Sequence, residues 1–279
     1  MIITINNLDL AQIADSGQCF RWKRLDDGSY EVIAYDRYLN LKQNGNEFEL
    51  SCDEADWKDI WAPYLDMDTD YECIGNKILS SEDEYLKEAY RYGSGIRILR
   101  QELWETLVSF IISQNNNIKR IRGSIEAICD KAALPLSGDV PTGASGRYRF
   151  PKPGELDREF FNDRELSLGY RDEYLADMFE YAADNPDFPG RLKDMDNEQA
   201  LNELKSFKGI GIKVANCVCL YGLHQVDAFP IDTHIKQILT NHYPDGFDFD
   251  RYKGVAGIVQ QYMFYHKINS PKVTETKSK

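Results

Sequence analysis

The chain has 279 residues, a mass of 32.2 kDa and a formal net charge of −13. Its composition, 42% hydrophobic and 28% charged, excludes a disordered or fibrous protein, and no apolar run approaches the roughly 18 residues that a membrane span requires. The start of the chain lacks the basic and apolar segments of a secretory signal. We therefore expect a cytoplasmic globular protein of about two domains, with free thiols at its six cysteines.

The first fifty residues carry the pattern of antiparallel strands. Apolar and polar residues alternate in four runs, near 20–22, 30–34, 39–41 and 48–50. Sequences that favour turns separate these runs, at Asp26-Asp27-Gly28, Asp36-Arg37 and Asn44-Gly45-Asn46. These features predict an antiparallel sheet at the start of the chain.

From about residue 53 onward, the apolar residues recur with the period of helices. Two stripes are clearest: Leu99, Leu103, Leu107, Phe110 and Ile111, and then Ile118, Ile121, Ile125 and Ile128. The stretch 134–153, rich in proline and glycine, predicts a loop. Asp196 with Gln199 predicts a capping box that opens another helix.

The predicted fold class is therefore α+β, with two domains and a tail. Residues 1–95 form an N-terminal antiparallel β-sheet domain with flanking helices, and residues 96–268 form an all-helical body. The polar residues 269–279 are expected to form a disordered tail. Nothing in the sequence indicates more than a monomer.

The net negative charge argues against a nucleic-acid partner, but its distribution weakens that argument. Residues 51–90 contain twelve acidic residues and three lysines, whereas 91–122 contain six basic and two acidic residues. Residues 204–226 contain three lysines and no acidic residue. One face of the protein could therefore bind a polyanion while the acidic remainder faces away from it.

The segment 204–223, LKSFKGIGIKVANCVCLYGL, predicts two helices joined by a glycine turn. Gly209 and Gly211 allow backbone N–H groups to approach a ligand, and the second helix adds the positive end of its dipole. Such a site suits a backbone phosphate. A dinucleotide fingerprint requires a preceding strand and is disfavoured by the helical flanks, while a helix–helix turn without a ligand stays open.

Lys213 lies in the first turn of the second helix, where the helix dipole disfavours a positive charge. A neutral amine is what an amine nucleophile requires, although a solvated surface lysine is the simpler interpretation. Asp232 follows nineteen residues later, at the expected N-cap of another helix, and could act with Lys213. Lys213 and Asp232 together, after a glycine hairpin, indicate a catalytic site more specifically than either residue alone.

Five motifs resemble those of the 8-oxoguanine DNA glycosylases of the helix-hairpin-helix superfamily, and the resemblance covers residues 10–268. They are SGQCFRW (16–22), SQNNNIKRI (113–121), LGYR (168–171), GIGIKVANC (209–217) and PIDTH (230–234). The resemblance implies a TBP-like sheet domain followed by helical subdomains. It also implies an enzyme that excises 8-oxoguanine from double-stranded DNA, preferably opposite cytosine, and then cleaves the strand. We expect no cofactor and no metal.

By resemblance, Lys213 is the nucleophile that attacks the sugar C1′, and Asp232 is its catalytic partner. The target base is flipped out of the duplex to reach them. The carbonyl of Gly17 would accept the N7–H that distinguishes 8-oxoguanine from guanine. The other residues that would bind the base are Cys217 and Phe264 on its two faces, Gln260 at its pairing edge and Phe110 at the wall of the site.

The resemblance implies two further groups of contacts, both to the duplex. In one group, Asn115 would fill the gap that the flipped base leaves in the duplex, and Tyr170 would wedge into the neighbouring base stack. Arg120 and Arg171 would donate hydrogen bonds to the unpaired cytosine. The other group contacts phosphates: Gly209, Gly211 and His234.

Simpler roles compete with several of these. The run Asn115–Asn117 could cap the helix that starts near Ile118, and Phe264 lies on an aromatic stripe that could be core. Two other functions stay open as well: a helix-hairpin-helix glycosylase for another damaged base, and a non-catalytic DNA-binding module. The cysteine spacing excludes an iron–sulfur endonuclease.

Overall fold

The N-terminal runs pair into one antiparallel sheet of five strands, as predicted. In the computed structural model, which describes residues 1–138, 140 and 146–270, the strand order is β1-β5-β4-β3-β2. The strands are β1 (Ile2–Thr4), β2 (Trp22–Arg24), β3 (Tyr30–Ala34), β4 (Arg37–Asn44) and β5 (Glu47–Leu50). The short edge strand β1 was not predicted, because three residues are too few to establish an alternation.

The register of the sheet follows the apolar alternation. Val32 lies opposite Leu39, and both are fully buried in the core of the sheet domain. The turn between β3 and β4 falls at Tyr35 and Asp36, which have φ of +51° and +62°, one residue earlier than the predicted turn at 36–37. Ala34 pairs with Arg37, so residues 35 and 36 form a two-residue loop, and positive φ at both of them is the geometry of a type I′ turn.

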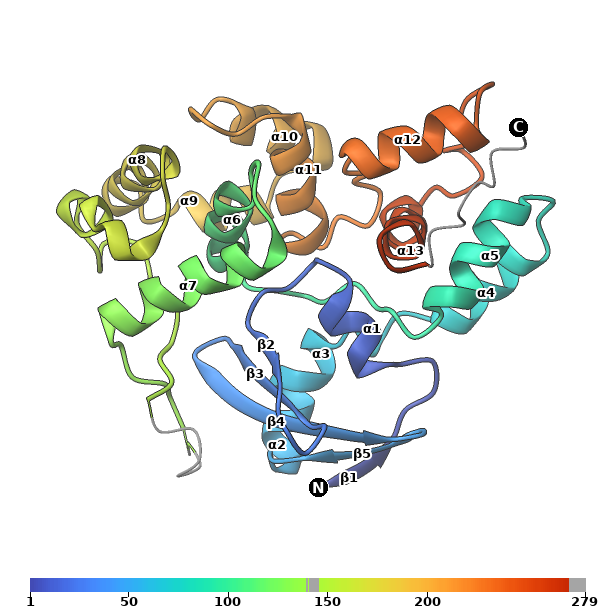
Figure 1. The fold of residues 1–279 in the computed structure, drawn as a ribbon, viewed down its shortest axis with the longest axis horizontal. Coiled ribbons are helices and arrows are strands. Elements are labelled where there is room, and N and C mark those ends of the chain that lie inside the picture. Colours follow the sequence, from blue (N-terminus) through green and yellow to red (C-terminus); the bar gives the residue numbers. More distant parts are fainter. Residues whose placement is uncertain (139, 141–145, 271–279) are drawn as a thin grey trace, which may run out of the picture.

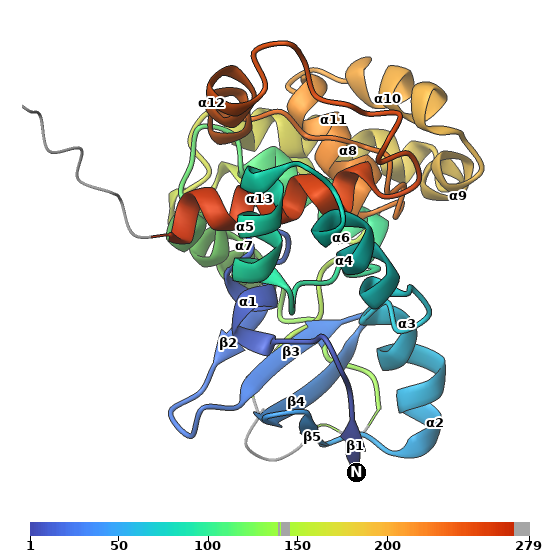
Figure 2. The ribbon, with the colours of Figure 1, turned by 90° about the vertical axis from the view of Figure 1, so that its right-hand side faces the viewer.

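Short helices cover one side of the sheet, and longer helices build the body beside it (Figures 1 and 2). The helices of the sheet domain are α1 (Leu10–Asp15), α2 (Glu54–Asp56), the π-helical turn η1 (Trp57–Trp61) and α3 (Ala62–Tyr64). The α-helices that follow are α4 (Tyr71–Leu79), α5 (Glu84–Gly93), α6 (Leu103–Ile112), α7 (Ile118–Ala132), α8 (Arg171–Asp184), α9 (Phe188–Lys193), α10 (Asn197–Lys205), α11 (Ile212–Tyr221), α12 (Thr233–His242) and α13 (Ala256–Asn269). Two short 3₁₀ helices precede α8: η3 (Arg158–Asn162) and η4 (Arg164–Leu166). No described helix is both long and apolar enough to cross a membrane.

The linker before α6 corrects the first predicted apolar stripe. Leu99 does not belong to that helix, because α6 begins only at Leu103 and the preceding residues are not helical. Ile98 packs in the core of the helical body, whereas Leu99 packs in the core of the sheet domain. The linker therefore contributes one side chain to each core. The four-residue spacing between Leu99 and Leu103 matched the period of a helix by coincidence. The second predicted stripe, 118–128, does lie on one helix, α7.

Two helices of the predicted N-terminal domain pack with the body. The buried residues of α4 and α5 belong to the larger core, and α5 lies along α13 near the C-terminus (Figure 2). The division at residue 95 stays a prediction, and these contacts count against it. The predicted tail overlaps the end of α13, and residues 271–279 lie outside the described residues.

The predicted loop 134–153 contains no helix in its described part and packs against the sheet domain. The backbone N–H of Ser137 donates to Asp36 O at 2.8 Å, and Arg147 forms a 2.6 Å ion pair with the nearly buried Glu31. Residues 139 and 141–145 lie outside the described part of the chain. This loop is therefore a second connection between the body and the sheet.

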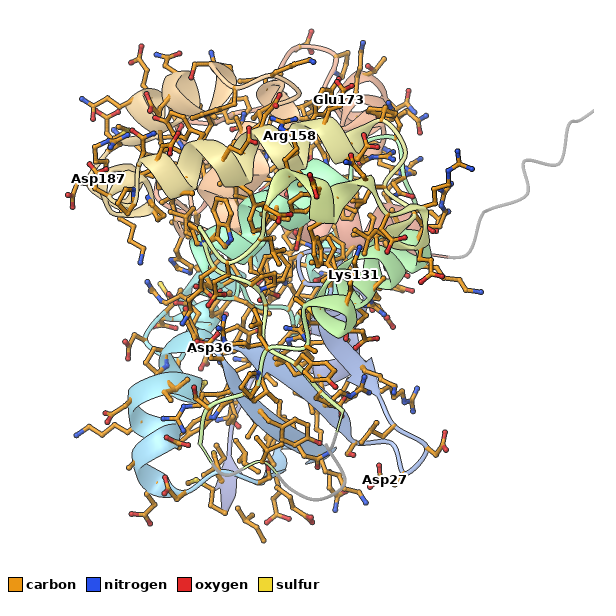
Figure 3. All side chains as sticks on the ribbon, turned by 90° about the vertical axis from the view of Figure 1, so that its left-hand side faces the viewer. Asp27, Asp36, Lys131, Arg158, Glu173 and Asp187 are labelled. Atoms are coloured by element: carbon orange, nitrogen blue, oxygen red, sulfur yellow. The ribbon has the colours of Figure 1, made fainter. Side chains whose placement is uncertain are left out.

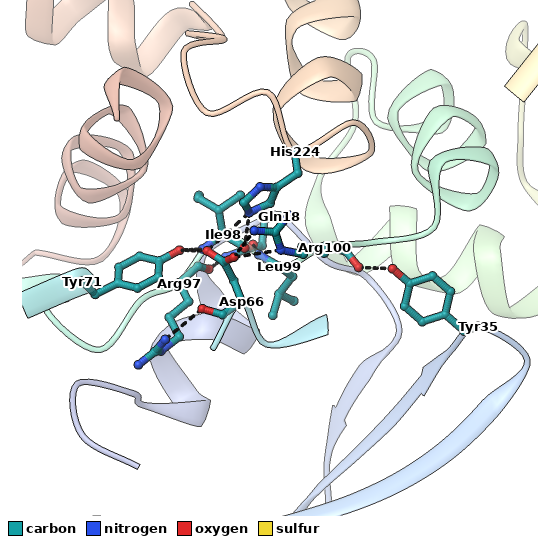
Figure 4. Close-up of polar contacts among 9 residues, drawn as sticks. All are labelled: Gln18, Tyr35, Asp66, Tyr71, Arg97, Ile98, Leu99, Arg100 and His224. Atoms are coloured by element: carbon teal, nitrogen blue, oxygen red, sulfur yellow. Dashed lines mark hydrogen bonds and ion pairs between the residues drawn. The ribbon is translucent and has the colours of Figure 1, made fainter. Parts of the chain in front are cut away.

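A buried carboxylate joins the sheet domain, the linker and the body (Figure 4). The fully buried Asp66 side chain accepts from Tyr71 Oη at 2.8 Å and from Arg100 Nε at 2.9 Å. His224, from the turn after α11, places Nε2 3.4 Å from the oxygen that Tyr71 contacts. Arg97 donates to the backbone carbonyl of Asp66 at 3.0 Å.

The charge of this carboxylate stabilises the fold. Burial alone raises the pKa of Asp66, but hydrogen bonds from His224 and Tyr71, with the charge of His224, outweigh burial and hold it at about 2. The unfolded value is 3.8. The stabilisation is therefore fully present above pH 3.8 and is lost as the pH falls through about 2.

We predict that Asp66→Asn lowers the free energy of unfolding by about 2 kcal/mol at pH 7, because the fold stabilises the ionised carboxylate and holds its pKa at about 2 instead of 3.8. Urea unfolding of the wild type and the variant measures this difference. The difference should shrink as the pH falls from 3.8 toward 2, since Asp66 then becomes neutral in the wild type as well.

Asp187→Asn is the matched control. Asp187 pairs with Arg191 at 2.6 Å, but its side chain is 65% exposed, so its loss should leave the free energy of unfolding nearly unchanged. Equal losses from the two variants would contradict the assignment of Asp66 as the buried junction.

Candidate active site

One open groove brings together most of the residues that the sequence singled out. It encloses about 1100 Å³ between the α6–α7 turn, the starts of α11 and α12, and α13. The predicted residues that line it are Gly17, Phe110, Asn115, Gly211, Lys213, Asp232, His234 and Phe264. The predicted residues that do not line it are Cys217, Gln260, Gly209, Tyr170, Arg171 and Arg120.

Lys213 enters the groove from the first turn of α11. Its side chain is half-buried, and Nζ lies 5.4 Å from the centroid of the Phe110 ring. Phe110 is held from behind, because it stacks on Tyr221 at 5.4 Å and meets Phe20 edge to face at 5.6 Å. The amine is therefore positioned over a rigid aromatic wall rather than extended into solvent.

Asp232 enters the same groove from the N-cap of α12, as the sequence predicted. Its Oδ1 accepts from the backbone N–H of Ile235 at 2.8 Å, which fixes the carboxylate at the start of the helix. Within the described residues Oδ2 accepts no hydrogen bond. One oxygen thus holds the side chain in place, and the other is available to a ligand.

Gly17 and Phe264 face each other across a narrow gap. Gly17 has a φ of +76°, and a Cβ atom added there would lie 3.2 Å from Cε1 of the Phe264 ring. Both the left-handed backbone and the close ring require glycine at this position. The exposed His234 ring lies edge to face with Phe264 at 6.0 Å and lines the outer part of the groove.

Cys217 and Gln260 lie buried, outside the lining of the groove. Burial raises the pKa of the Cys217 thiol to about 11, although the charge of Lys213 opposes the shift, so the thiol is neutral at pH 7. Gln260 donates to Pro230 O at 3.1 Å, while its buried Oε1 has no hydrogen-bond partner. An unpartnered buried oxygen is unfavourable unless a ligand satisfies it.

The glycine hairpin connects α10 and α11 as predicted. The capping box of Asp196 and Gln199 opens α10. Gly209 has a φ of +86°, and an added Cβ would lie 2.7 Å from Cγ of the Tyr174 ring. Gly211 is the N-cap of α11 and supplies no side-chain hydrogen bond. The first amides of α11 therefore remain available to an anion.

Asn115 and Tyr170 meet at the rim, although they are 55 residues apart in the sequence. Asn115 Nδ2 donates to Tyr170 Oη at 3.2 Å, and Tyr170 is 50% exposed. Asn115 has a φ of +46°, a conformation that asparagine tolerates. The capping role considered for this run falls to Asn117, which caps α7 through the N–H of Arg120.

Arg171 is placed differently from what its predicted role requires. It is only 5% exposed, and its guanidinium donates to backbone carbonyls of Leu168, Gln114 and Asn115. These bonds hold the α6–α7 turn and so support Asn115. Cytosine recognition by Arg171 stays a prediction. Arg120 is exposed, and its side chain forms no hydrogen bond or ion pair with a described residue.

The cations of the groove differ from those of the flank built by α7, α8 and α9 (Figure 3). On the flank, ion pairs neutralise basic residues: Lys131 with Asp163, Arg158 with Asp177 and Glu180, and Arg191 with Asp187. The three basic residues that line the groove and form no ion pair in the described chain are Lys119, Lys213 and Lys236. Their positive charge is thus available to a polyanion.

Sequence reasoning missed Lys119 and Lys236, which line the groove. A signal existed in the sequence. Lys119 lies inside the motif SQNNNIKRI, and Lys236 lies two residues after the end of PIDTH. Only the structure shows that the start of α7 and the start of α12 contribute these two lysines to the same groove.

Comparison with known proteins agrees with this geometry. Residues 1–107 match the family model of the N-terminal domain of 8-oxoguanine DNA glycosylase. The N-glycosylase/DNA lyase of Saccharomyces cerevisiae is 30% identical over 271 residues, which cover 87% of this chain and 70% of that protein.

Solved structures give the same result over almost the whole chain. The Clostridium acetobutylicum 8-oxoguanine glycosylase/lyase, in complex with dsDNA containing cytosine opposite 8-oxoG, is 31% identical, with a TM-score of 0.84 and coverage of 95% of this chain and 97% of that chain. MBOgg1, in complex with a low affinity DNA ligand, is 36% identical, with a TM-score of 0.86 and coverage of 96% and 94%. This chain therefore belongs to the 8-oxoguanine DNA glycosylase family of N-glycosylase/DNA lyases.

Proposed function

We propose that the chain excises 8-oxoguanine from duplex DNA, preferably opposite cytosine, and cleaves the strand at the resulting abasic site. The observation that carries this proposal is the meeting of Lys213 and Asp232 in one groove, where two helix starts supply an amine and a carboxylate. The relatives support the same pair of reactions, since they are N-glycosylase/DNA lyases. Action on chromosomal DNA would place the enzyme in the cytoplasm, at the nucleoid if the source is a prokaryote.

In the proposed reaction, Lys213 first gives up a proton to solvent, and the lone pair of Nζ then attacks C1′ of the damaged nucleotide. The glycosidic bond breaks and its electron pair leaves with the base. Loss of a proton from Nζ and opening of the sugar ring then give a Schiff base between Nζ and C1′. Removal of a proton from C2′ expels the 3′ phosphate by β-elimination. Asp232, held by its bond to Ile235, would stabilise the positive charge that develops on the sugar.

The base would occupy the space beside Gly17. The carbonyl of Gly17 is the proposed acceptor for the N7–H of 8-oxoguanine, a group that guanine lacks. Phe264 and the neutral thiol of Cys217 would cover the two faces of the base without adding charge. The unpartnered Oε1 of Gln260 would accept a hydrogen bond from the pairing edge.

The duplex would lie across the unpaired cations of the groove. Asn115 and Tyr170, which touch each other at the rim, would replace the flipped base in the stack. Arg120 would donate hydrogen bonds to the cytosine from its guanidinium, which makes no hydrogen bond to a described residue. For Arg171 to contact the cytosine, its guanidinium would have to break a hydrogen bond to a backbone carbonyl and donate to the base instead. The hairpin of Gly209 and Gly211 and the exposed His234 would bind phosphates.

Borohydride trapping tests the function directly. The duplex carries one 8-oxoguanine opposite cytosine, and a duplex with undamaged guanine is the control. A covalent protein–DNA adduct on the damaged duplex alone supports the proposal. An adduct only on an abasic duplex would indicate a glycosylase for another base, and no adduct on either would indicate a non-catalytic DNA-binding module.

We predict that Lys213→Gln abolishes the trapped adduct and strand cleavage, because the amide cannot form a Schiff base. Binding to the damaged duplex, measured by fluorescence anisotropy, should survive. Lys58→Gln, an exposed lysine of the sheet domain, is the control and should leave both activities intact. Residual strand cleavage by Lys213→Gln would refute the assignment of the nucleophile.

We predict that Arg120→Ala relaxes the preference for cytosine opposite the lesion by about tenfold, as expected for the loss of a planar base-reading donor worth 1–3 kcal/mol. Single-turnover excision opposite each of the four bases measures the ranking. Lys119→Ala should instead weaken binding to all four duplexes alike. An unchanged ranking in Arg120→Ala would refute its role.

We predict that Gly209→Ala lowers the free energy of unfolding by about 2 kcal/mol and weakens duplex binding several-fold. The alanine would be strained at positive φ and would displace Tyr174 from the hairpin. Thermal unfolding and anisotropy measure the two effects. Gly190→Ala, in open space on α9, should instead raise stability by up to about 1 kcal/mol, and a loss of the same size there would refute the argument.

A further inference from the structure

A single buried glutamine connects the nucleophile helix to the proposed lesion-reading loop. Gln261 is fully buried on α13, next to Gln260, and does not line the groove. Its Nε2 donates to the backbone carbonyl of Ser16 at 2.6 Å, and its Oε1 accepts from Tyr221 Oη. Figures 1 and 2 show α13 between α1 and α11, so the amide bridges the two sides.

Three polar groups of the residues on either side of Gly17 are held by hydrogen bonds from glutamine side chains. Ser16 Oγ accepts from Gln18 Nε2 at 2.9 Å, and the carbonyl of Gln18 accepts from Gln101 Nε2 at 2.8 Å. The carbonyl of Ser16 is the one that Gln261 holds. Gly17 makes no backbone hydrogen bond to any described residue, so its carbonyl is free for a ligand.

Tyr221 makes this bridge relevant to catalysis. It is the last residue of α11, the helix that begins beside Lys213, and its ring stacks on Phe110 under the Lys213 amine. Two hydrogen bonds through one side chain therefore connect the helix of the nucleophile to the residue that precedes Gly17. Because Ser16 is only 1% exposed, its carbonyl has no water to replace Gln261.

We infer that Gln261 is a positioning residue for lesion recognition, which sets the Gly17 carbonyl at a fixed distance from the Lys213 amine. This inference rests on the proposed function. Without the Gln261 amide, the carbonyl of Ser16 loses its partner and the loop shifts to find another. Base recognition then suffers, because it depends on the position of Gly17. Lysis of a preformed abasic site does not, since no base is read in that step.

The experiment compares two rates in Gln261→Met, which fills the same space but offers no amide. One rate is single-turnover excision of 8-oxoguanine opposite cytosine, and the other is strand cleavage at a preformed abasic site. We expect the ratio of excision to abasic-site cleavage to fall at least tenfold, with abasic-site cleavage within twofold of the wild type. The wild type serves as the test of the proposed function, since it must excise 8-oxoguanine for the comparison to be made.

Gln225→Met is the matched control. Gln225 also donates to a backbone carbonyl, that of Met195 at 2.9 Å, and accepts from a side chain, Asn197, but it lies outside the groove. Its ratio should equal that of the wild type. A fall of both rates together in Gln261→Met, or the same ratio in both glutamine variants, would overturn the inference by showing a purely structural role.

Tyr221→Phe provides a second variant that keeps the ring and the fold of α11. It removes the donor to Gln261 Oε1 while leaving the bond to Ser16, so the amide is anchored at one end only. We expect a smaller fall in the same ratio, about threefold, with abasic-site cleavage unchanged. An unchanged ratio in Tyr221→Phe would overturn the proposed connection to α11.

Discussion

The buried carboxylate of Asp66 is the constraint on which the arrangement of the two halves depends. A charge without access to solvent must be compensated by donors in contact with it, and here those donors come from Tyr71, Arg100 and His224. Arg100 belongs to the linker before α6, and two neighbouring linker residues pack in different cores: Ile98 in the core of the helical body and Leu99 in the core of the sheet domain. The two halves are therefore joined by charge compensation and by apolar packing at the same place, and neither half can shift without disturbing both.

The position of Gly17 in the groove depends on this junction. Gln18, adjacent to Gly17, donates to the linker carbonyl of Arg97 and accepts from the N–H of Leu99, each at 2.9 Å. The SGQ segment of the sheet domain is thus held against the same linker that Asp66 fixes (Figure 4). Three helix starts complete the groove. Asn117 and Asp232 cap their own helices, whereas Gly211 leaves the amides of α11 without a side-chain partner.

The parts of the site that could be predicted from the sequence are those determined by local rules. A glycine hairpin, an aspartate before a helix and an apolar alternation each act over a few residues, so Gly209, Asp232 and the sheet were found in their places. The motif resemblance added the pairing of distant segments, such as Asn115 with Tyr170.

What could not be predicted depends on contacts between elements. Leu99 matched a helical stripe, and only the junction shows that it points into the sheet domain. Arg171 was predicted to read the cytosine, yet its guanidinium donates to backbone carbonyls of Gln114 and Asn115 in another segment. Gln261 carries no signal in the sequence, because its two partners lie 40 and 245 residues away.

The neutralised flank and the unpaired cations of the groove bear on how such an enzyme finds rare damage. With a net charge of −13, the protein as a whole repels a duplex, whereas the groove presents lysines that form no ion pair with a described residue and attract one. Few phosphates can then be neutralised at a time, so attraction to undamaged DNA is weak and sensitive to salt. Short residence at each position lets one molecule sample many base pairs, and long residence is reserved for a base that also fills the pocket.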